Sequence, residues 1–225
     1  MISVIIPTLN EEGNIGRCIE SLQSEDGHVE VIVADGGSTD STVETARRYG
    51  SLVVTAERCR GCQMNAGASV AGGDMLLFLH ADATLERGWS GAMRDALHSG
   101  LFVGGAFRFI INAPGLRYRF VEAGVALRCS IFSLPYGDQG IFMARQTFRR
   151  LGGFREIPLM EDVDMIERMK GLGRIGILPK RAKTDARRWR TKGVVRTSIA
   201  NRTMMFLYRM GVDPHKLARI YYGKT

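Results

Sequence analysis

Hydrophobic and polar positions follow two alternating periods along the first hundred residues. Short apolar runs, each typical of a buried strand, occupy residues 2–6, 29–34, 52–55 and 75–79. The segments between them place apolar residues at helical spacing, as at Ile15, Cys18, Ile19 and Leu22. Strands that alternate with helices pair in parallel through right-handed crossovers. The pattern therefore predicts an α/β fold with a Rossmann-like, mostly parallel sheet flanked by helices.

Capping residues predict where these helices begin and end. Asn10 is expected to cap the first helix, and Ser41-x-x-Glu44 is a capping box that opens the second. That second helix is expected to end at Gly50. A helix of small residues leads from Gly61 to the strand at 75–79.

The pattern changes after residue 100. A β segment is predicted at 102–111, where Gly104 and Gly105 indicate a bend or a close approach of two backbones. Further strands are predicted at 141–144 and near 175–178, followed by a helical C-terminal extension. Neither repeats nor a low-complexity linker interrupt the chain, so a single domain is expected.

Two amphipathic segments allow two interpretations. Residues 116–134 mix arginines with large apolar side chains, and residues 194–222 do the same. Each segment is predicted either to pack on the sheet or to lie peripherally on a membrane. The chain has no secretory signal pattern in residues 1–9 and no apolar run of the roughly 18 residues that span a bilayer. A cytoplasmic location is therefore expected, with a peripheral contact at the inner face of the membrane as an open option.

The net charge of +8 is unevenly distributed. Residues 180–202 contain nine lysines and arginines against one acid, Asp185. Nucleotide phosphates, a lipid headgroup or nucleic acid would complement this charge, and a solvated basic face is an equally simple explanation. Nucleic acid is disfavoured because the chain lacks recognition motifs and interleaved aromatic residues.

The four cysteines do not suggest a disulfide framework or a zinc site, which favours a reducing compartment. Cys18 and Cys129 lie among apolar residues and are expected in the core. Cys59 and Cys62 form a single Cys-x-x-Cys, which we interpret as incidental.

Carboxylates follow several predicted strands or open helices. The apolar run 75–79 ends on His80 and Asp82, and ligands of open α/β sheets bind beyond the carboxyl ends of strands. Asp35, Asp138 and Asp162 occupy comparable positions beside glycines or at a helix start. Such a set could contact a base or ribose, hold a metal against two phosphates, and take a proton from an attacking hydroxyl. Arginines within 58–60 or 187–190 could stabilise a leaving phosphate.

Several short motifs occur in an order that we recognise. They are Pro7-Thr-Leu-Asn10-Glu11, Asp35-Gly-Gly-Ser38-Thr-Asp40, Asn65-x-Gly67, Gly73-Asp74, His80-Ala-Asp82, Gly137-Asp-Gln-Gly140, Gly152-Gly-Phe154 and Glu161-Asp162. In this order, over residues 1 to about 165, the chain resembles family 2 glycosyltransferases, in particular a short, soluble bacterial subgroup. The resemblance implies the GT-A fold, a nucleotide-diphosphate sugar as donor and a divalent cation. It also divides the single domain, 1–225, into a nucleotide-binding half (1–100), an acceptor-side half (101–180) and a basic helical tail (181–225).

The resemblance implies roles for individual residues. Those expected around the nucleotide are Pro7, Thr8, Asn10, Glu11, Asp35, Gly36, Ser38, Arg60, Gln63, Asn65, His80 and Ala81. Those expected near the acceptor or the diphosphate are Gly137, Asp138, Gln139, Arg188 and Trp189. Asp82, with His80, would bind the metal. Asp162 would be the general base, beside Glu161.

Two departures from the family pattern affect these roles. His80 stands where the first Asp of the family's Asp-x-Asp is usual, and an imidazole suits Mn²⁺ better than Mg²⁺. His80 could instead contact only the diphosphate, or be a wall residue. Asp185-Ala-Arg-Arg188-Trp189 partly resembles the Gln-x-x-Arg-Trp of processive synthases without its Gln. Arg188 and Trp189 could close over the diphosphate or stack on a sugar, or belong to an ordinary basic loop.

The first hypothesis is therefore a metal-dependent transferase. It would move a sugar from a UDP- or GDP-type donor to an unknown acceptor, lipid-linked or small, by one inverting displacement. The alternatives are a non-catalytic nucleotide-sugar-binding protein of the same fold and a nucleotidyltransferase. The last is disfavoured because no lysine-containing glycine loop follows the first strand. Sugar, base, acceptor and oligomeric state are not predicted.

Overall fold

The computed structural model describes residues 1–23 and 29–223. Its strands are β1 (Ile2–Thr8), β2 (Val29–Asp35), β3 (Leu52–Thr55), β4 (Met75–Phe78), β5 (Ala83–Leu85), β6 (Gly104–Asn112), β7 (Ile141–Ala144) and β8 (Ile175–Asp185). Its helices up to the middle of the chain are α1 (Glu12–Gln23), α2 (Thr42–Arg48), α3 (Arg60–Val70), α4 (Trp89–His98) and α5 (Leu116–Phe132). They are followed by the 3-10 helix η1 (Gly137–Gln139), α6 (Arg145–Leu151), α7 (Glu161–Lys170), α8 (Arg187–Lys192), α9 (Val194–Arg209) and α10 (Pro214–Tyr222).

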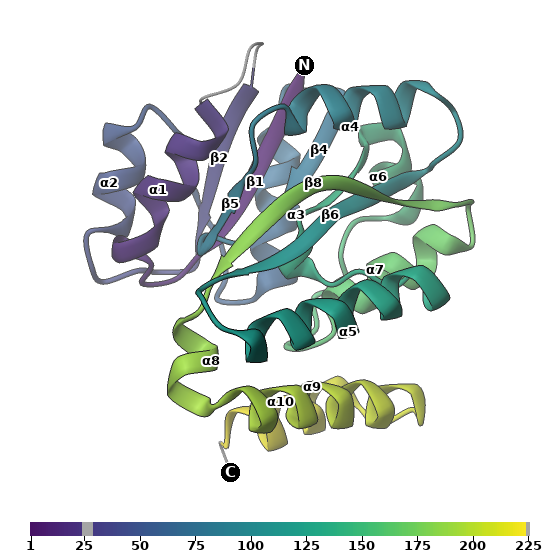
Figure 1. Cartoon of the computed structure of the whole chain (residues 1–225). Helices are drawn as coiled ribbons and strands as arrows, with labels where there is room; N and C mark the ends of the chain where they lie inside the picture. Colours follow the sequence, from purple (N-terminus) through teal and green to yellow (C-terminus); the bar gives the residue numbers. More distant parts are fainter. Residues whose placement is uncertain (24–28, 224–225) are drawn as a thin grey trace.

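The strands form one mixed sheet that is flanked by helices (Figure 1). Their order in the sheet is β3-β2-β1-β4-β7-β6-β8-β5. The first four strands are parallel, as the strand–helix alternation predicts. Strand β7 is antiparallel to both β4 and β6, and β5 is antiparallel to β8, while β6 and β8 are parallel. The prediction of a mostly parallel α/β sheet flanked by helices is confirmed.

Strand β5 shows that the sheet curls. It is the last strand in the sheet order, yet it lies against α1, where the backbone N–H of Leu85 donates to Ser21 Oγ at 3.2 Å. Sequence analysis missed this three-residue strand, because it follows His80 and Asp82 directly. It brings the far edge of the sheet back beside the β4 end that carries these two residues.

Alternation along the central strands divides the core between the two faces of the sheet. In β1, Val4 and Ile6 belong to one buried apolar cluster with α1 and α4, in which Trp89 is fully buried. Ile5 belongs to a second cluster with α3, α6 and α7. Helix α6 was not predicted.

Two predicted helix caps are wrong. Asn10 has a φ of 55°, and its Oδ1 accepts a hydrogen bond from the N–H of Thr39 instead of capping α1. Ser41 occupies the N-cap of α2 without a side-chain hydrogen bond, so the expected capping box is absent. Asp40 takes that role, because its Oδ1 accepts from the N–H of Thr42 at 3.0 Å. In both cases a neighbouring polar side chain competes for the same backbone donors.

The glycine prediction is confirmed for β6. A Cβ on Gly104 would stand 2.5 Å from the carbonyl oxygen of Phe142, and one on Gly105 would stand 2.2 Å from that of Gly176. The cysteines are free, and Cys18 and Cys129 are buried as expected. Cys59 has a structural use, since its Sγ accepts from the N–H of Cys62 at the N-cap of α3.

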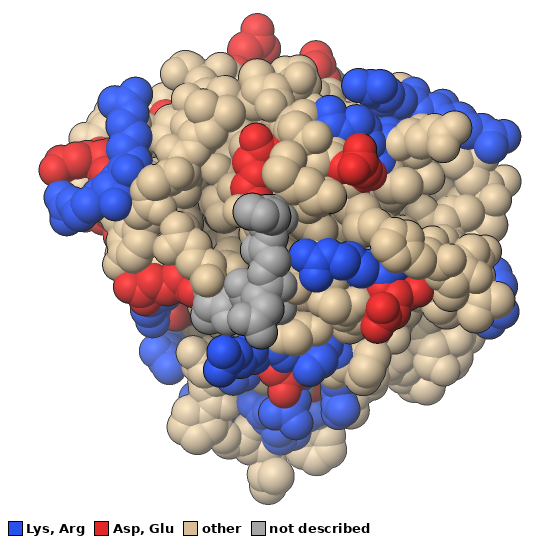
Figure 2. All heavy atoms as spheres, turned by 90° about the horizontal axis from the view of Figure 1, so that it is seen from above, with Lys and Arg blue, Asp and Glu red and all other residues tan. Residues whose placement is uncertain are grey.

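The C-terminal part differs from the expected boundary. Residues 181–185, predicted as the start of the tail, extend β8, because they pair with β6 and β5. Helices α8, α9 and α10 then cross the lower end of the molecule, beside α5 (Figure 1). Within the described residues, none of the helices has the length and apolar character needed to cross a membrane. Figure 2 shows the opposite end of the molecule, over which side chains of both charges are scattered.

Candidate functional site

The loop after β2 is organised by a single carboxylate. Asp35 is buried and accepts four hydrogen bonds, from the backbone N–H groups of Gly37 and Ser38 and from the hydroxyls of Ser38 and Thr8. Its oxygens therefore shape the loop that follows β2. Pro7 and Thr8 lie beside it at the end of β1, in register with Ala34 and Asp35.

Two amides predicted near the nucleotide have structural partners. Gln63 is buried, and its Nε2 donates to the carbonyl oxygens of Thr8 and Ala34 at 2.7 and 2.8 Å, which joins the ends of β1 and β2. A Cβ on Gly36 would stand 3.1 Å from this amide. Asn65 binds the backbone of Phe154 through both its amide nitrogen and its oxygen. These bonds explain why glutamine and asparagine occur at these positions.

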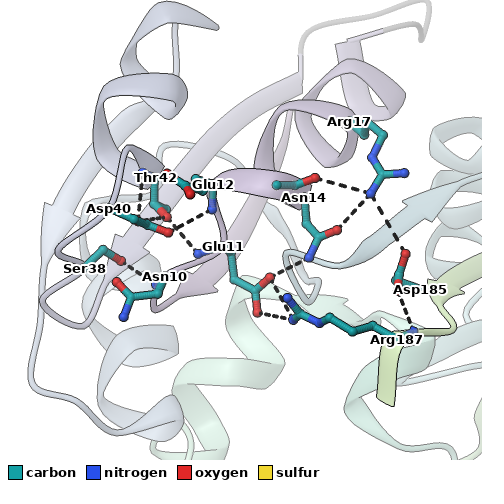
Figure 3. Close-up of polar contacts among 11 residues, drawn as sticks. Asn10, Glu11, Glu12, Asn14, Arg17, Ser38, Asp40, Thr42, Asp185 and Arg187 are labelled. Carbon is teal, nitrogen blue, oxygen red and sulfur yellow. Dashed lines mark hydrogen bonds and ion pairs between the residues drawn. The ribbon is translucent and has the colours of Figure 1, made fainter. Parts of the chain in front are cut away.

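Glu11 takes part in a ring of polar contacts between α1 and the start of α8 (Figure 3). Its carboxylate accepts from Asn14 Nδ2 at 2.7 Å and from Arg187 Nη2 at 3.2 Å. Asn14 also accepts from Arg17, which lies 4.0 Å from Asp185. The N–H of Arg187 donates to Asp185, which closes the ring. The ring links the loop after β1 to the end of β8, where the N–H of Asp185 donates to the carbonyl oxygen of Asp82.

His80 and Asp82 lie between β4 and β5. The pKa of His80 is lowered to about 3, by burial first and also by the charges of Arg60 and Arg188, so the imidazole is neutral near pH 7. Burial raises the pKa of Asp82, with Glu11 adding to the effect. Ala81, between them, is buried and presents no polar side chain.

Helix η1 faces the acidic start of α7. The N–H of Gly137 donates to Asp162 Oδ2 at 2.7 Å. A Cβ at Gly137 would stand 2.9 Å from His80 Nε2 and 3.3 Å from the same Asp162 oxygen. His80 and Asp162 thus meet at Gly137, where a Cβ would displace their side chains, although they are far apart in the sequence.

Asp138 is the least satisfied group of this region. Its Oδ1 is buried and has no hydrogen-bond partner among the described residues. The pKa of Asp138 is raised to about 6, by burial first and also by the charges of Asp162 and Asp82, against the opposing charges of Arg128 and Arg188. Perturbed carboxyls without partners are characteristic of binding and catalytic sites.

Gln139 is fixed by its neighbours and holds η1 in place. Its Nε2 donates to the carbonyl oxygen of Phe107, and its Oε1 accepts from Arg128 Nη2 and from the N–H of Tyr136. Arg128 also lies over the ring of Tyr136, at 3.4 Å from its centre. Sequence analysis missed Arg128, because its helical position gives no sign that it reaches η1.

Arg60 is the predicted cation that lies among these acids. Its guanidinium is 3.7 Å from Glu161 Oε1, and the charges of Asp162 and Asp82 also act on it. Glu161 is buried, and burial raises its pKa to about 7, with Asp162 adding to the effect and Arg60 opposing it. Glu161 thus holds Arg60 beside Asp162, with a charge that depends on pH near neutrality.

Arg188 and Trp189 have separate environments. Arg188 is exposed and bonds Asn201 Oδ1 at 3.1 Å, and its charge acts on His80 and Asp138. Trp189 is 8% exposed and packs in a cluster with Phe109 and other apolar residues. The structure thus leaves Trp189 no exposed ring face with which to stack on a sugar.

A metal at this site would have to be shared with a ligand. Within the described ranges, 1–23 and 29–223, the side chains of His, Cys, Asp and Glu do not form a group of three or more that could hold an ion. Asp82 and neutral His80 supply an oxygen and a nitrogen donor, and further ligands would have to come from phosphate oxygens or water. This donor set suits Mn²⁺ better than Mg²⁺.

Comparison with known proteins places this arrangement in a family. The family model described as Glycosyl transferase family 2 matches residues 3–150, about two thirds of the chain. A PGL/p-HBAD biosynthesis glycosyltransferase of Mycobacterium bovis is 37% identical over 93 residues, which are 38% of this chain and 36% of the relative. A 4,4'-diaponeurosporenoate glycosyltransferase of Staphylococcus haemolyticus is 38% identical over 95 residues, covering 38% of this chain and 25% of the relative. The chain thus covers only about a third or less of the length of these relatives.

Solved structures share the fold at low sequence identity. TarS of S. aureus superposes with a TM-score of 0.61 and 20% identity over 82% of this chain and 60% of that one. The mannosyltransferase PcManGT from Pyrobaculum calidifontis, in complex with GDP-Man and Mn²⁺, superposes with a TM-score of 0.59 and 22% identity over 81% of this chain and 56% of that one. On the family match and this architecture, the chain belongs to glycosyltransferase family 2 and has the GT-A fold.

Proposed function

We propose that the chain transfers a sugar from a UDP- or GDP-type nucleotide-diphosphate sugar to an acceptor hydroxyl, in the cytoplasm. The observation that carries this proposal is the meeting of His80, Asp138 and Asp162 at η1, with Arg60 beside them. Mycobacterial glucosyl-3-phosphoglycerate synthase, a neighbour of the same fold with a TM-score of 0.56, was solved with Mn²⁺ and UDP. That neighbour supports a nucleotide as a ligand of this fold.

The reaction would be a single displacement. The acceptor hydroxyl gives its proton to the Asp162 carboxylate, and its oxygen forms a bond to the anomeric carbon as the bond to the β-phosphate breaks. The electron pair leaves with the nucleoside diphosphate, and the configuration at the anomeric carbon inverts. Asp162 has one oxygen on the N–H of Gly137 and the other on the N–H of Val163, so its orientation is fixed.

The leaving diphosphate would be stabilised by cations. A divalent ion bound to Asp82 and His80 would neutralise part of the developing charge. Arg60, held by Glu161, and Arg188 would contribute positive charge, since the charges of both act on His80. Their long side chains are partly exposed, so they can approach a bound phosphate without breaking the core.

Calorimetry with UDP, GDP, dTDP and CDP, each with and without Mn²⁺ and Mg²⁺, tests the binding part. One tight, Mn²⁺-dependent diphosphate is expected, and Asp82→Asn should remove the metal dependence. Asp162→Asn should keep the affinity and reduce turnover by about a hundredfold or more. Glu167→Gln, on the same helix, is the matched control. Full turnover in Asp162→Asn would exclude this residue as the base.

A non-catalytic nucleotide-sugar-binding protein is the second candidate, favoured by one observation. His80 replaces an acidic metal ligand of the family, and it stays neutral. Tight, metal-dependent diphosphate binding without donor hydrolysis or transfer to any acceptor tested would favour this function.

A further inference from the structure

Helix α5 presents a continuous apolar stripe to solvent. Leu116 and Phe120 are 77% and 74% exposed, and Leu127, Ile131 and the small Ala123 are also exposed. At 100° per residue these five positions fall within a sector of about 80°. The opposite side of the helix, with Tyr118 and Cys129, packs toward the sheet. Of the two interpretations of this segment, packing on the sheet and contact with a membrane, the second therefore has an exposed apolar surface that supports it.

Helix α9 repeats the pattern. Its exposed apolar residues are Val195, Ile199, Phe206 and Met210 (the C-cap), at the spacing found in α5, with Arg202 in place of the central alanine. They fall within an equally narrow sector, and Met204 on the opposite side is buried. Two stripes of this kind on neighbouring helices exceed the scattered apolar residues of an ordinary surface.

The two stripes lie side by side. A guanidinium nitrogen of Arg202 is 3.9 Å from the Cβ position of Gly124, and the guanidinium of Arg209 is 5.8 Å from the Phe132 ring centre. The second contact lies further toward the C-terminal end of both helices than the first, so α5 and α9 run parallel (Figure 1).

The stripes also face the same way. Successive residues of a helix are rotated by about 100° in a fixed direction. On α5 the side that contacts α9 lies about 100° ahead of the stripe in that direction. On α9 the contact with α5 lies about 60° before the stripe. For parallel helices, these opposite offsets turn both stripes outward on one common face. We call the nine residues named above the α5/α9 face, together with Arg202 between them.

Arginines border both stripes of the α5/α9 face, and the residues of α5 and α9 place no acid beside them. Arg117 and Arg119 border the stripe of α5, and Arg196 borders that of α9. Arg196 and Arg202 form no ion pair with an acid in the described part of the chain. Helix α9 contains no acid, and the single acid of α5, Glu122, is nearly buried and paired with Arg119. Long arginine stems allow the charged groups to reach outward while the apolar residues insert.

We propose that the α5/α9 face binds the surface of an anionic lipid bilayer. An apolar stripe between basic residues is the arrangement that inserts at the boundary of headgroups and acyl chains. A second copy of this chain fits less well, because a symmetric contact through this face would bring its arginines against their own copies. This inference does not depend on the proposed reaction. The face belongs in part to α9, the helix whose Asn201 accepts a hydrogen bond from Arg188 on its other side.

Vesicle co-sedimentation of the full chain tests the proposal. The probes are vesicles of phosphatidylcholine alone and of phosphatidylcholine with phosphatidylglycerol in a three-to-one ratio. The chain should bind the anionic vesicles, and binding should weaken as salt rises. Leu127→Glu should lower partitioning about tenfold or more, and Arg196→Gln about fivefold, because each removes one of the two contributions.

Matched controls separate the face from general effects. Leu101→Glu changes a residue that is 59% exposed, against 61% for Leu127, but that lies between α4 and β6. Arg48→Gln on α2 removes the same charge as Arg196→Gln. Both controls should bind as the unchanged chain does. Equal binding to neutral vesicles, equal loss in the controls, or no binding at low salt would overturn the proposal. So would a dimer in sedimentation velocity that Leu127→Glu dissociates, because it would make a second copy the occupant of this face.

Discussion

Replacing Asp138 with asparagine is expected to stabilise the fold and impair the site. The substitution keeps the shape of the side chain and removes a charge from an oxygen that has no partner in the described structure. The pKa of this carboxyl rises from 3.8 to about 6 on folding, mainly because of burial. A raised pKa means that the contribution to stability is fully present below pH 3.8 and is lost as pH rises through about 6.

The magnitude follows from that shift. A rise of about two pKa units means that ionising Asp138 costs the folded protein about 3 kcal/mol more than it costs the unfolded chain. The buried amide of asparagine also lacks partners, which costs about 1 kcal/mol. Above pH 7 the Asp138→Asn protein should therefore be more stable by about 2 kcal/mol, a rise in melting temperature of roughly 5 °C for a domain of this size. Toward pH 4 the advantage should disappear.

Urea unfolding of both proteins at steps from pH 4 to pH 8 measures this difference directly. Subtracting the two curves removes the contributions of other titrating groups, such as Glu161. Asp95→Asn, at an exposed position of α4, should show no comparable pH-dependent gain. If the difference in free energy of unfolding between the two proteins is the same at every pH in this range, the Asp138 carboxyl is already satisfied and the reasoning is refuted. Turnover should fall in the stabilised variant, since a charge kept at a cost in stability is expected to serve a ligand.

Three further changes test the supports of the site. Gln63→Leu should lower the free energy of unfolding by about 2–4 kcal/mol in urea titrations, because two buried carbonyl oxygens lose their donor; a change below 1 kcal/mol would contradict the bridging role. Arg187→Ala should cost less than about 0.5 kcal/mol, because the Arg187 side chain of its pair with Glu11 is largely exposed, yet it should raise amide hydrogen exchange in α8. Gly137→Ala should reduce turnover about a hundredfold with little loss of stability, by displacing the two side chains that meet at this residue. Gly91→Ala, where no atom lies within 4 Å of the new Cβ, should leave turnover unchanged and so serves as the control.

Strand ends are the part of the site that the sequence predicts well. A short apolar run bounded by glycines and polar residues is a local signal, and the carboxyl ends of such strands necessarily lie at one edge of the sheet. This reasoning identified His80 and Asp82, and the structure puts them in one region with Asp138 and Asp162. Their proposed chemical roles remain predictions.

The partners of individual polar side chains are much harder to predict. Gln63 and Asn65 were expected near a nucleotide, but each binds backbone groups of a distant segment. An amide serves a ligand or a carbonyl equally well, and only the packing of α3 decides which one it meets. The helix caps failed for the same reason, because Asp40 and Ser41 offer similar oxygens to the same donors. Trp189 likewise gave no signal that it would be buried.

Comparing Asp35 with Asp138 distinguishes a carboxylate that holds the fold from one that is available to a ligand. Both are aspartates beside glycines, and both were expected to contact the substrate. Asp35 accepts four hydrogen bonds from its own loop, whereas one oxygen of Asp138 accepts none from the described residues. A ligand at Asp35 must share or displace bonds that hold the loop, and a ligand at Asp138 relieves a buried charge. Binding energy is therefore more readily available at Asp138, on the side of the site that faces Asp162 and the proposed acceptor.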